Sequence, residues 1–237
     1  MTITQNELVQ LLRSRSDEKF RIFNEKIIHT SKLKVIGVKM PDIKALAAKH
    51  SDSYKEIFEL PYDSFEELMF KGAALGLAKA PLSEKEPYIY RYGEMIDNWA
   101  ECDCFCTALK PAKGEREKLR EIIDDMLFSD KEFVSRIGIV LLFSKFHDEQ
   151  SADYALGVYE KLPCGAYYRD MAVAWGISVY CVYFPEKTAE YLRSSPIAID
   201  IKRKAAQKIR DSRRISDEIK KRITDAVNKE YERSADK

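Results

Sequence analysis

The stretch EFVSRIGIVLLFSKF at residues 132–146 decides the fold class, together with YYRDMAVAWGISVYCVYF at residues 167–184. Both stretches are apolar on nearly every side of a helix of 3.6 residues per turn, so neighbours must cover such a helix on several faces. Helices sandwiched between stacked helix pairs have this pattern. The rest of the chain also has a helical period, and strand-like alternation is nearly absent. We therefore expect an all-α protein.

The pattern indicates about a dozen short helices with brief connections and no low-complexity linker, which predicts one α-helical domain over residues 1–237. A globular bundle and a stacked solenoid are both possible. Helix pairs recur at intervals of roughly 35 to 40 residues without a strict sequence repeat, which is typical of degenerate HEAT-like arrays. We therefore expect a curved solenoid of antiparallel helix pairs, with its binding surface on the concave face.

The composition is that of an ordinary globular protein, with 45% hydrophobic and 33% charged residues in a chain of 237. No apolar run approaches 18 residues, and the first fifteen residues lack the pattern of a secretory signal. We expect a cytoplasmic, monomeric protein that does not contact membranes. The five cysteines are an odd number, which favours reduced thiols over a disulfide framework.

The net charge of +1 conceals a gradient along the chain. Residues 200–222 contain ten basic and four acidic residues, a net charge of +6, so the rest is negative. Such a local basic stripe is expected of a protein that binds a polyanion, although a solvated C-terminal helix would look the same. On a helix over about 198–214, the core side would hold Ile201, Ala205 and Ile209, and another face would hold Arg203, Gln207, Arg210 and Arg214.

The stretch IDNWAECDCFC at residues 96–106 concentrates three cysteines beside a tryptophan and an aspartate. A structural zinc site needs pairs of thiolates two to four residues apart in a turn, plus a second pair or histidines, and His29, His50 and His147 form no such pair. A nucleophilic thiol needs a base or a lowered pKa, and the pattern indicates neither. Buried packing residues are therefore the favoured reading of these cysteines, and we expect no bound metal.

Trp99 and Asp103 are four residues apart, so both lie on one face of a helix. Taken alone, a tryptophan in the core and an aspartate on a solvated face would explain them. Arg136 interrupts a strongly apolar helix and must be paired or line a groove, because an unpaired buried charge is costly. Trp175 lies among small residues that permit close helix approach. Together these side chains favour a binding site.

Several stretches of the chain resemble a known family, the HEAT-like DNA alkylation repair proteins, which include the alkylpurine DNA glycosylase D enzymes. The resemblance extends over residues 35 to 216 in the family's order. It is carried by VIGVKMPDIKALAAKH, IDNWAECD, EFVSRIGIVLLF, YYRDMAVAW and KRKAAQKIRDSRRIS.

The resemblance implies a curved solenoid that holds double-stranded, alkylated or otherwise damaged DNA in its concave groove. It assigns the active-site tryptophan and aspartate to Trp99 and Asp103, the second tryptophan to Trp175, and the groove arginine to Arg136. Active members of the family also carry an arginine shortly after the second tryptophan, where this chain has Ser178. The remaining expected DNA contacts are an aromatic pair and the basic stripe: Tyr167, Tyr168, Arg203, Lys204, Arg210 and Arg214.

An alkylpurine alkylated at N7 or N3 is already cationic, so its glycosidic bond breaks without protonation of the leaving base. A carboxylate such as Asp103 can stabilise the developing oxocarbenium charge and orient water, and the two indoles can attract the cationic nucleotide. We expect a monofunctional alkylpurine DNA glycosylase that needs no cofactor. A non-catalytic relative that binds damaged or branched DNA and a HEAT-type protein scaffold are the alternatives.

Overall fold

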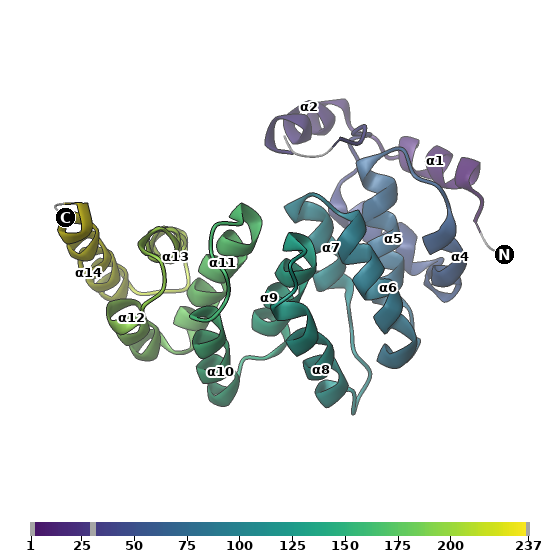
Figure 1. Ribbon diagram of the computed structural model, residues 1–237. Coiled ribbons are helices and arrows are strands. Elements are labelled where there is room, and N and C mark those ends of the chain that lie inside the picture. The colour runs from purple at the N-terminus through teal and green to yellow at the C-terminus, as the bar shows by residue number, and fades with distance from the viewer. Residues whose placement is uncertain (1–2, 29–31, 236–237) are drawn as a thin grey trace. The chain divides into compact units, whose positions relative to one another are not determined.

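Fourteen α-helices and one short 3-10 helix account for most of residues 3–28 and 32–235, which this computed structural model describes (Figure 1). Those residues form no β-strand, and the only strand-like pairing among them is an isolated bridge between Lys34 and Ser64. The prediction of an all-α fold is confirmed.

The chain divides into two compact units, Met1–Met126 and Leu127–Lys237, which we describe one at a time. The single domain over residues 1–237 stays a prediction. The helices of the first unit are α1 (Gln5–Arg13), α2 (Glu18–Ile27), α3 (Met40–Ala48), η1 (Ser51–Ser53), α4 (Tyr54–Glu59), α5 (Phe65–Leu77), α6 (Leu82–Met95), α7 (Trp99–Ala108) and α8 (Arg116–Leu127), which ends at the boundary. The helices of the second unit are α9 (Glu132–Lys145), α10 (Glu149–Tyr159), α11 (Tyr167–Tyr183), α12 (Pro185–Ser194), α13 (Ile199–Asp211) and α14 (Asp217–Ala235).

Helix α5 is the centre of the first unit, because it packs against α3 on one side and α7 on the other. All of its residues except Leu77 are buried. Close approach to α7 depends on Gly76, where a Cβ atom would lie 2.9 Å from the Cβ of Ala108. A larger residue at this position would push the two helices apart.

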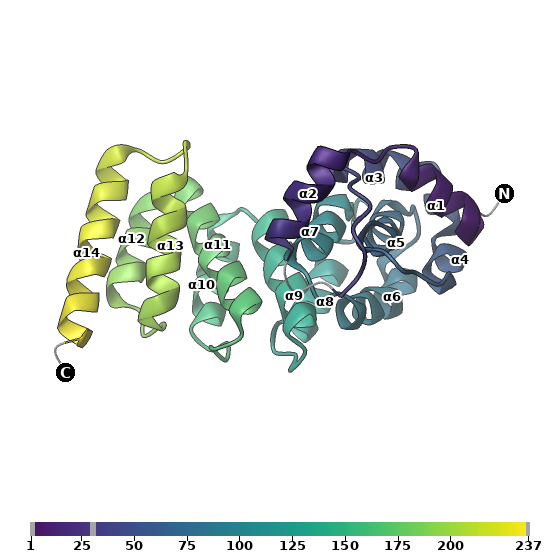
Figure 2. The same ribbon diagram turned by 90° about the horizontal axis from the view of Figure 1, so that it is seen from above.

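Helix α11 has the same position in the second unit, packed between α9 and α13. Figures 1 and 2 show these three helices following one another, with α10 and α12 beside them. Gly176 faces the hydroxyl of the fully buried Tyr159, so no side chain fits there. The expectation that residues 132–146 and 167–184 form helices covered on several faces is confirmed.

Contacts between helices two apart in the chain keep a nearly constant sequence separation. In the second unit, Arg136 bonds Tyr168 at a separation of 32 residues and Tyr180 bonds Phe146 at 34. In the first unit, the Cys104 thiol donates to the Met69 carbonyl oxygen at a separation of 35. In each unit this step occurs twice, from α3 to α5 to α7 and from α9 to α11 to α13, which is compatible with the predicted solenoid. Its curvature stays a prediction.

Candidate nucleic-acid interface

Helix α7 exposes one narrow stripe, and that stripe begins with Trp99 and Asp103. Both side chains are half-buried, Thr107 one turn further on is exposed, and every other residue of α7 is buried. The spacing of four residues places the three side chains one above another. Asp103 is therefore the one carboxylate that α7 presents at its surface.

Two hydrogen bonds cap the start of α7, and they position Trp99, the first residue of the helix. The side chain of Asn98 accepts a 2.9 Å hydrogen bond from the Ala100 amide, and the Glu101 carboxylate accepts one of 3.1 Å from the Asp97 amide. The first bond satisfies an amide that the first helical turn leaves without a partner, and the second holds the residue before the N-cap. The cap thus positions the stripe at its Trp99 end.

The lower end of the stripe is tied to helix α3 of the same unit. Lys44 donates a 2.5 Å hydrogen bond from Nζ to the Thr107 hydroxyl, which itself donates to the Asp103 carbonyl oxygen at 2.6 Å. Lys44 therefore brings a cation to the same surface. Sequence reasoning missed it, because nothing in the local pattern links residue 44 to residue 107.

The three cysteines of α7 lie on its buried side, as expected of packing residues. Cys102, Cys104 and Cys106 have no exposed surface, and burial raises the pKa of the Cys104 thiol to about 12. A thiol with so high a pKa stays protonated at neutral pH and is a poor nucleophile and metal ligand. Over residues 3–28 and 32–235, no three metal-ligating side chains form a group. His29 lies outside the described residues.

A buried carboxyl group lies beneath the stripe. Glu101 is fully buried, and burial, reinforced by the nearby Asp97 carboxylate, raises its pKa to about 8. Burial also raises the pKa of Asp97. Because Glu101 is inaccessible, Asp103 is the carboxylate of α7 that a ligand could reach.

The second candidate tryptophan, Trp175, is half-buried in the middle of α11. Its ring packs edge-on against Phe143 of α9, with 4.8 Å between ring centroids. Ser178 is buried, and its hydroxyl donates to the Trp175 carbonyl oxygen at 2.7 Å. The position where active relatives are expected to carry an arginine therefore offers no charge to a ligand.

Arg136 is 4% exposed, and its guanidinium donates a 2.7 Å hydrogen bond to the carbonyl oxygen of Tyr168. We expected this arginine to be paired or to line a groove, and the structure shows it paired with a backbone carbonyl group. Its direct contact with DNA stays a prediction. In this structure it holds the first turn of α11.

The aromatic pair at the start of α11 forms a cluster that reaches three helices of the second unit. Tyr167 is exposed and packs edge-on against Tyr168, at 5.1 Å between centroids. Tyr168 also contacts Phe133 of α9 at 5.1 Å, and Lys204 of α13 lies 5.0 Å from the centroid of the Tyr167 ring. Two of the predicted DNA contacts, Tyr167 and Lys204, thus adjoin each other.

The predicted division of α13 into a core side and a basic side is confirmed by burial. Its buried stripe includes Ile201, Ala205 and Ile209, and Arg203, Gln207 and Arg210 are exposed.

The prediction that this helix extends to about residue 214 is wrong. Helix α13 ends at Asp211, and the backbone of Ser212 is extended. The Ser212 hydroxyl accepts a hydrogen bond from the Arg214 amide, as serine side chains often do in turns. Arg214 therefore lies beyond the helix, with its guanidinium 5.5 Å from the centroid of the Tyr183 ring.

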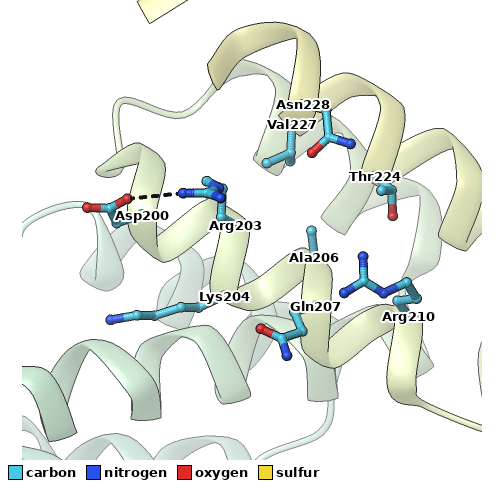
Figure 3. A pocket seen from close by; sticks show the side chains of 9 residues that line it. All are labelled: Asp200, Arg203, Lys204, Ala206, Gln207, Arg210, Thr224, Val227 and Asn228. Atoms are coloured by element: carbon cyan, nitrogen blue, oxygen red, sulfur yellow. Dashed lines mark ion pairs between the residues drawn. The ribbon is translucent and has the colours of Figure 1, made fainter. Parts of the chain in front are cut away.

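A polar groove of 390 Å³ lies between α13 and α14, and its lining is drawn in Figure 3. Its floor is made by Ala206 and Val227, both buried. Sequence reasoning named only the α13 side of this groove. The remaining lining residues are Asp200, Arg203, Lys204, Gln207 and Arg210 from α13, and Thr224 and Asn228 from α14.

A second aromatic contact at the far end of α11 was also missed. His147 stacks on Tyr183 at 4.9 Å, and Arg214 covers the same tyrosine. His147 follows α9, Tyr183 is the last residue of α11, and Arg214 follows α13. Only the helical repeat brings them together, so the local pattern could not show the cluster.

Two comparisons with known proteins bear on this site. A family profile described as DNA alkylation repair enzyme matches residues 8–163. The match includes Trp99, Asp103 and Arg136 and ends before α11 begins. A search of curated proteins returned no match. No helix among the described residues has both the length and the apolar character that crossing a membrane requires.

Proposed function

We propose that this chain, which belongs to the DNA alkylation repair enzyme family, hydrolyses the N-glycosidic bond of cationic alkylated purines in double-stranded DNA. Membership of this family supports a role in repairing alkylation damage to DNA. The reaction type and the duplex substrate are our proposal. 7-Methylguanine and 3-methyladenine are the bases we expect it to release.

The exposed stripe of α7 is the observation that carries the proposal. Of the ten residues of this helix, only Trp99, Asp103 and Thr107 reach the surface, so an indole and a carboxylate are presented together within one turn. The combination of an indole and a carboxylate on the one open side of this helix supports a ligand-binding role. Both residues lie inside the span that matches the family.

The two groups suit a cationic nucleotide. A carboxylate held near C1′ stabilises the positive charge that develops on the sugar and can orient the attacking water. The face of an indole attracts a cation, with a contribution of about 0.5 to 2 kcal/mol. A neutral base would require protonation as it leaves, and the stripe presents no general acid for that step. Neutral lesions should therefore be poor substrates.

DNA engagement would follow from the basic residues of the second unit. Arg203, Lys204 and Arg210 of α13 are suited to phosphates, and Tyr167 lies beside Lys204. Contacts of this kind position a duplex without reading its sequence. Binding should therefore weaken steeply with salt and show little sequence preference.

The test is base release from a duplex that contains 7-methylguanine, under single-turnover conditions. Wild type should release the base, and Asp103→Asn should do so at least tenfold more slowly with nearly unchanged duplex affinity, because a transition-state interaction is lost. Asp125→Asn, which changes an exposed carboxylate on α8, is the matched control. Equal rates for wild type and Asp103→Asn would remove Asp103 from the mechanism.

A non-catalytic DNA-binding relative is the second candidate, and Ser178 favours it. Its hydroxyl is turned to the Trp175 carbonyl oxygen, so α11 offers no cation at the position where active members carry one. Such a protein would bind damaged or branched duplex tightly and release no base. Restoring the charge with Ser178→Arg should then produce measurable release, although the buried position makes a stability check necessary.

A further inference from the structure

The groove between α13 and α14 has features that the basic stripe of α13 alone does not explain. Figure 3 shows side chains of both helices along its two sides, with Arg203 towards one end and Arg210 towards the other. Neither of the α14 residues Thr224 and Asn228 has been assigned a role so far. The groove lies wholly inside the second unit.

Contacts between the two helices show that they run antiparallel along the groove. Near the start of α13, Lys202 donates hydrogen bonds of 2.8 and 2.9 Å to the Glu230 carboxylate near the end of α14. Arg203 lies 4.0 Å from the centroid of the Tyr231 ring. These contacts join the two helices near the Arg203 end of the groove, and Arg210 and Thr224 line the opposite end.

The two arginines are seven residues apart, so they lie on the same side of α13 at a separation of about 10 Å. Arg203 is partly engaged by Asp200, at 3.9 Å, but that carboxylate is largely exposed and the pair contributes little. Arg210 has neither an ion pair nor a hydrogen bond from its side chain to any other described residue. Two cations at this distance are too far apart to share one phosphate group.

Between the arginines, the groove offers neutral hydrogen-bond donors and a shallow floor. Gln207 lies between them on α13, and Asn228 and Thr224 come from the opposite side. Amide and hydroxyl groups also donate to phosphate and sugar oxygens, without adding charge. The small side chain of Ala206 keeps the floor low enough for a chain of atoms to lie along the groove.

We propose that this groove binds the phosphodiester backbone of one DNA strand, with Arg203 and Arg210 on two different phosphates and Asn228 donating from the opposite side. The arginines are about 10 Å apart along the helix, well beyond the axial rise of about 3.4 Å per nucleotide of one strand, so they would contact different phosphates. The inference rests on the proposed function only in taking DNA as its ligand. It adds α14 to the DNA interface.

The test measures the affinity of the full-length protein for an undamaged duplex at several salt concentrations, with folding checked by the thermal transition. The double variant Arg203→Ala/Arg210→Ala should lower the magnitude of the salt slope by about two, one for each lost phosphate contact. Asn228→Ala should weaken binding about fivefold and leave the slope unchanged, because a neutral donor releases no counterion. Arg193→Ala, at an exposed arginine of α12 outside the groove, should bind as wild type does.

Charge changes at residue 228 make the test independent of folding defects. Asn228→Lys should bind more tightly and increase the slope magnitude by about one, whereas Asn228→Asp should bind more weakly. A damaged fold cannot account for tighter binding. If both variants bind as wild type does while the arginine variants weaken binding, DNA contacts the α13 face without entering the groove, and the inference is overturned.

Base release from the 7-methylguanine duplex separates this inference from the proposed function. If wild type releases no base but the variants at residue 228 change affinity as expected, the glycosylase proposal fails and the groove assignment stands. If base release is normal and the variants leave affinity unchanged, the groove assignment fails and the glycosylase proposal stands.

Discussion

Glu132 and Arg136 of α9 bind the backbone amide and the backbone carbonyl oxygen of the same residue, Tyr168, at the first turn of α11. The Glu132 carboxylate accepts the Tyr168 amide at 2.5 Å, and the Arg136 guanidinium donates to the Tyr168 carbonyl oxygen at 2.7 Å. A carboxylate at a helix N-terminus also interacts favourably with the helix dipole. The pair therefore sets the position of the aromatic residues that begin α11.

We expect Arg136→Ala to act on stability more than on the charge of the DNA interface. Loss of a charged hydrogen bond to the part-buried carbonyl of Tyr168 should cost about 1.5 to 3 kcal/mol of unfolding free energy. The salt slope of duplex binding should stay within half a unit of wild type, because Arg136 is 4% exposed. Urea unfolding and a salt titration measure the two effects. A slope lowered by a full unit with unchanged stability would show that Arg136 contacts a phosphate instead.

Thiol accessibility tests the packing of α7. Of the five free cysteines, Cys164 is exposed and the other four are buried. In the native protein, a thiol reagent should therefore modify one cysteine quickly and the remaining four only after denaturation. Cys164→Ser should abolish the fast phase and serves as the control.

Replacing Cys102, Cys104 and Cys106 together with alanine should lower stability through core truncation and leave duplex affinity and base release within a few-fold of wild type. The readouts are urea unfolding, duplex binding and single-turnover release. Stoichiometric zinc in the purified protein, or complete inactivation of a folded triple variant, would contradict the packing interpretation.

Glu101 predicts a dependence of stability on pH. Its pKa is about 8 in the folded protein and 4.5 in an ordinary environment, so the folded state holds a proton that the unfolded state releases. The contribution of Glu101 to the free energy of unfolding is fully present below pH 4.5, and it is lost as the pH rises through 8. Unfolding free energy should fall by up to about 1.4 kcal/mol per pH unit between pH 5 and 7.5. Glu101→Gln should flatten this fall in urea titrations.

Glu66 supplies the control for that measurement. Burial raises its pKa too, but three backbone amides, those of Ile36, Gly37 and Val38, stabilise its charged form. Glu66→Gln should therefore reduce stability at every pH and leave most of the fall in place. A fall that disappears in Glu66→Gln and persists in Glu101→Gln would reverse the assignment.

The spacing of apolar residues was enough to predict an all-α chain, and a spacing of four was enough to place Trp99 and Asp103 on one face. Both are properties of a single helix. The end of α13 was missed because the residues after Asp211 include neither glycine nor proline, and the turn depends on the Ser212 hydroxyl. The contact of Lys44 with Thr107 depends on how helices pack, which a local pattern does not contain.

Arg214 should contribute one phosphate contact, even though it lies beyond α13. Arg214→Ala should weaken binding to any duplex and lower the magnitude of the salt slope by about one, with no change in sequence preference. Salt titrations with two duplexes of unrelated sequence measure both quantities. Binding equal to wild type at low salt would mean that the guanidinium only packs on Tyr183.

The two tryptophans should differ in how substitution affects the protein. Trp175 packs against Phe143, so Trp175→Ala should lower stability by about 3 kcal/mol or more as well as weaken binding of the lesion. Trp99 begins α7 on its exposed stripe, so Trp99→Ala should cost less stability. In both variants, affinity for the lesion and the rate of base release should fall together, unlike in Asp103→Asn, because an indole attracts the cationic base before and during the reaction.

Phenylalanine substitutions separate cation attraction from contact area. Trp99→Phe should keep much of the contact and lose part of the attraction, because indole is the best of the aromatic groups at binding cations. The preference for a 7-methylguanine duplex over the same undamaged duplex should therefore shrink, while affinity for the undamaged duplex changes little. Parallel binding curves for the two duplexes measure this preference. If Trp99→Phe weakens binding of both duplexes equally, Trp99 contacts DNA outside the lesion, and the stripe of α7 is not the site of base recognition.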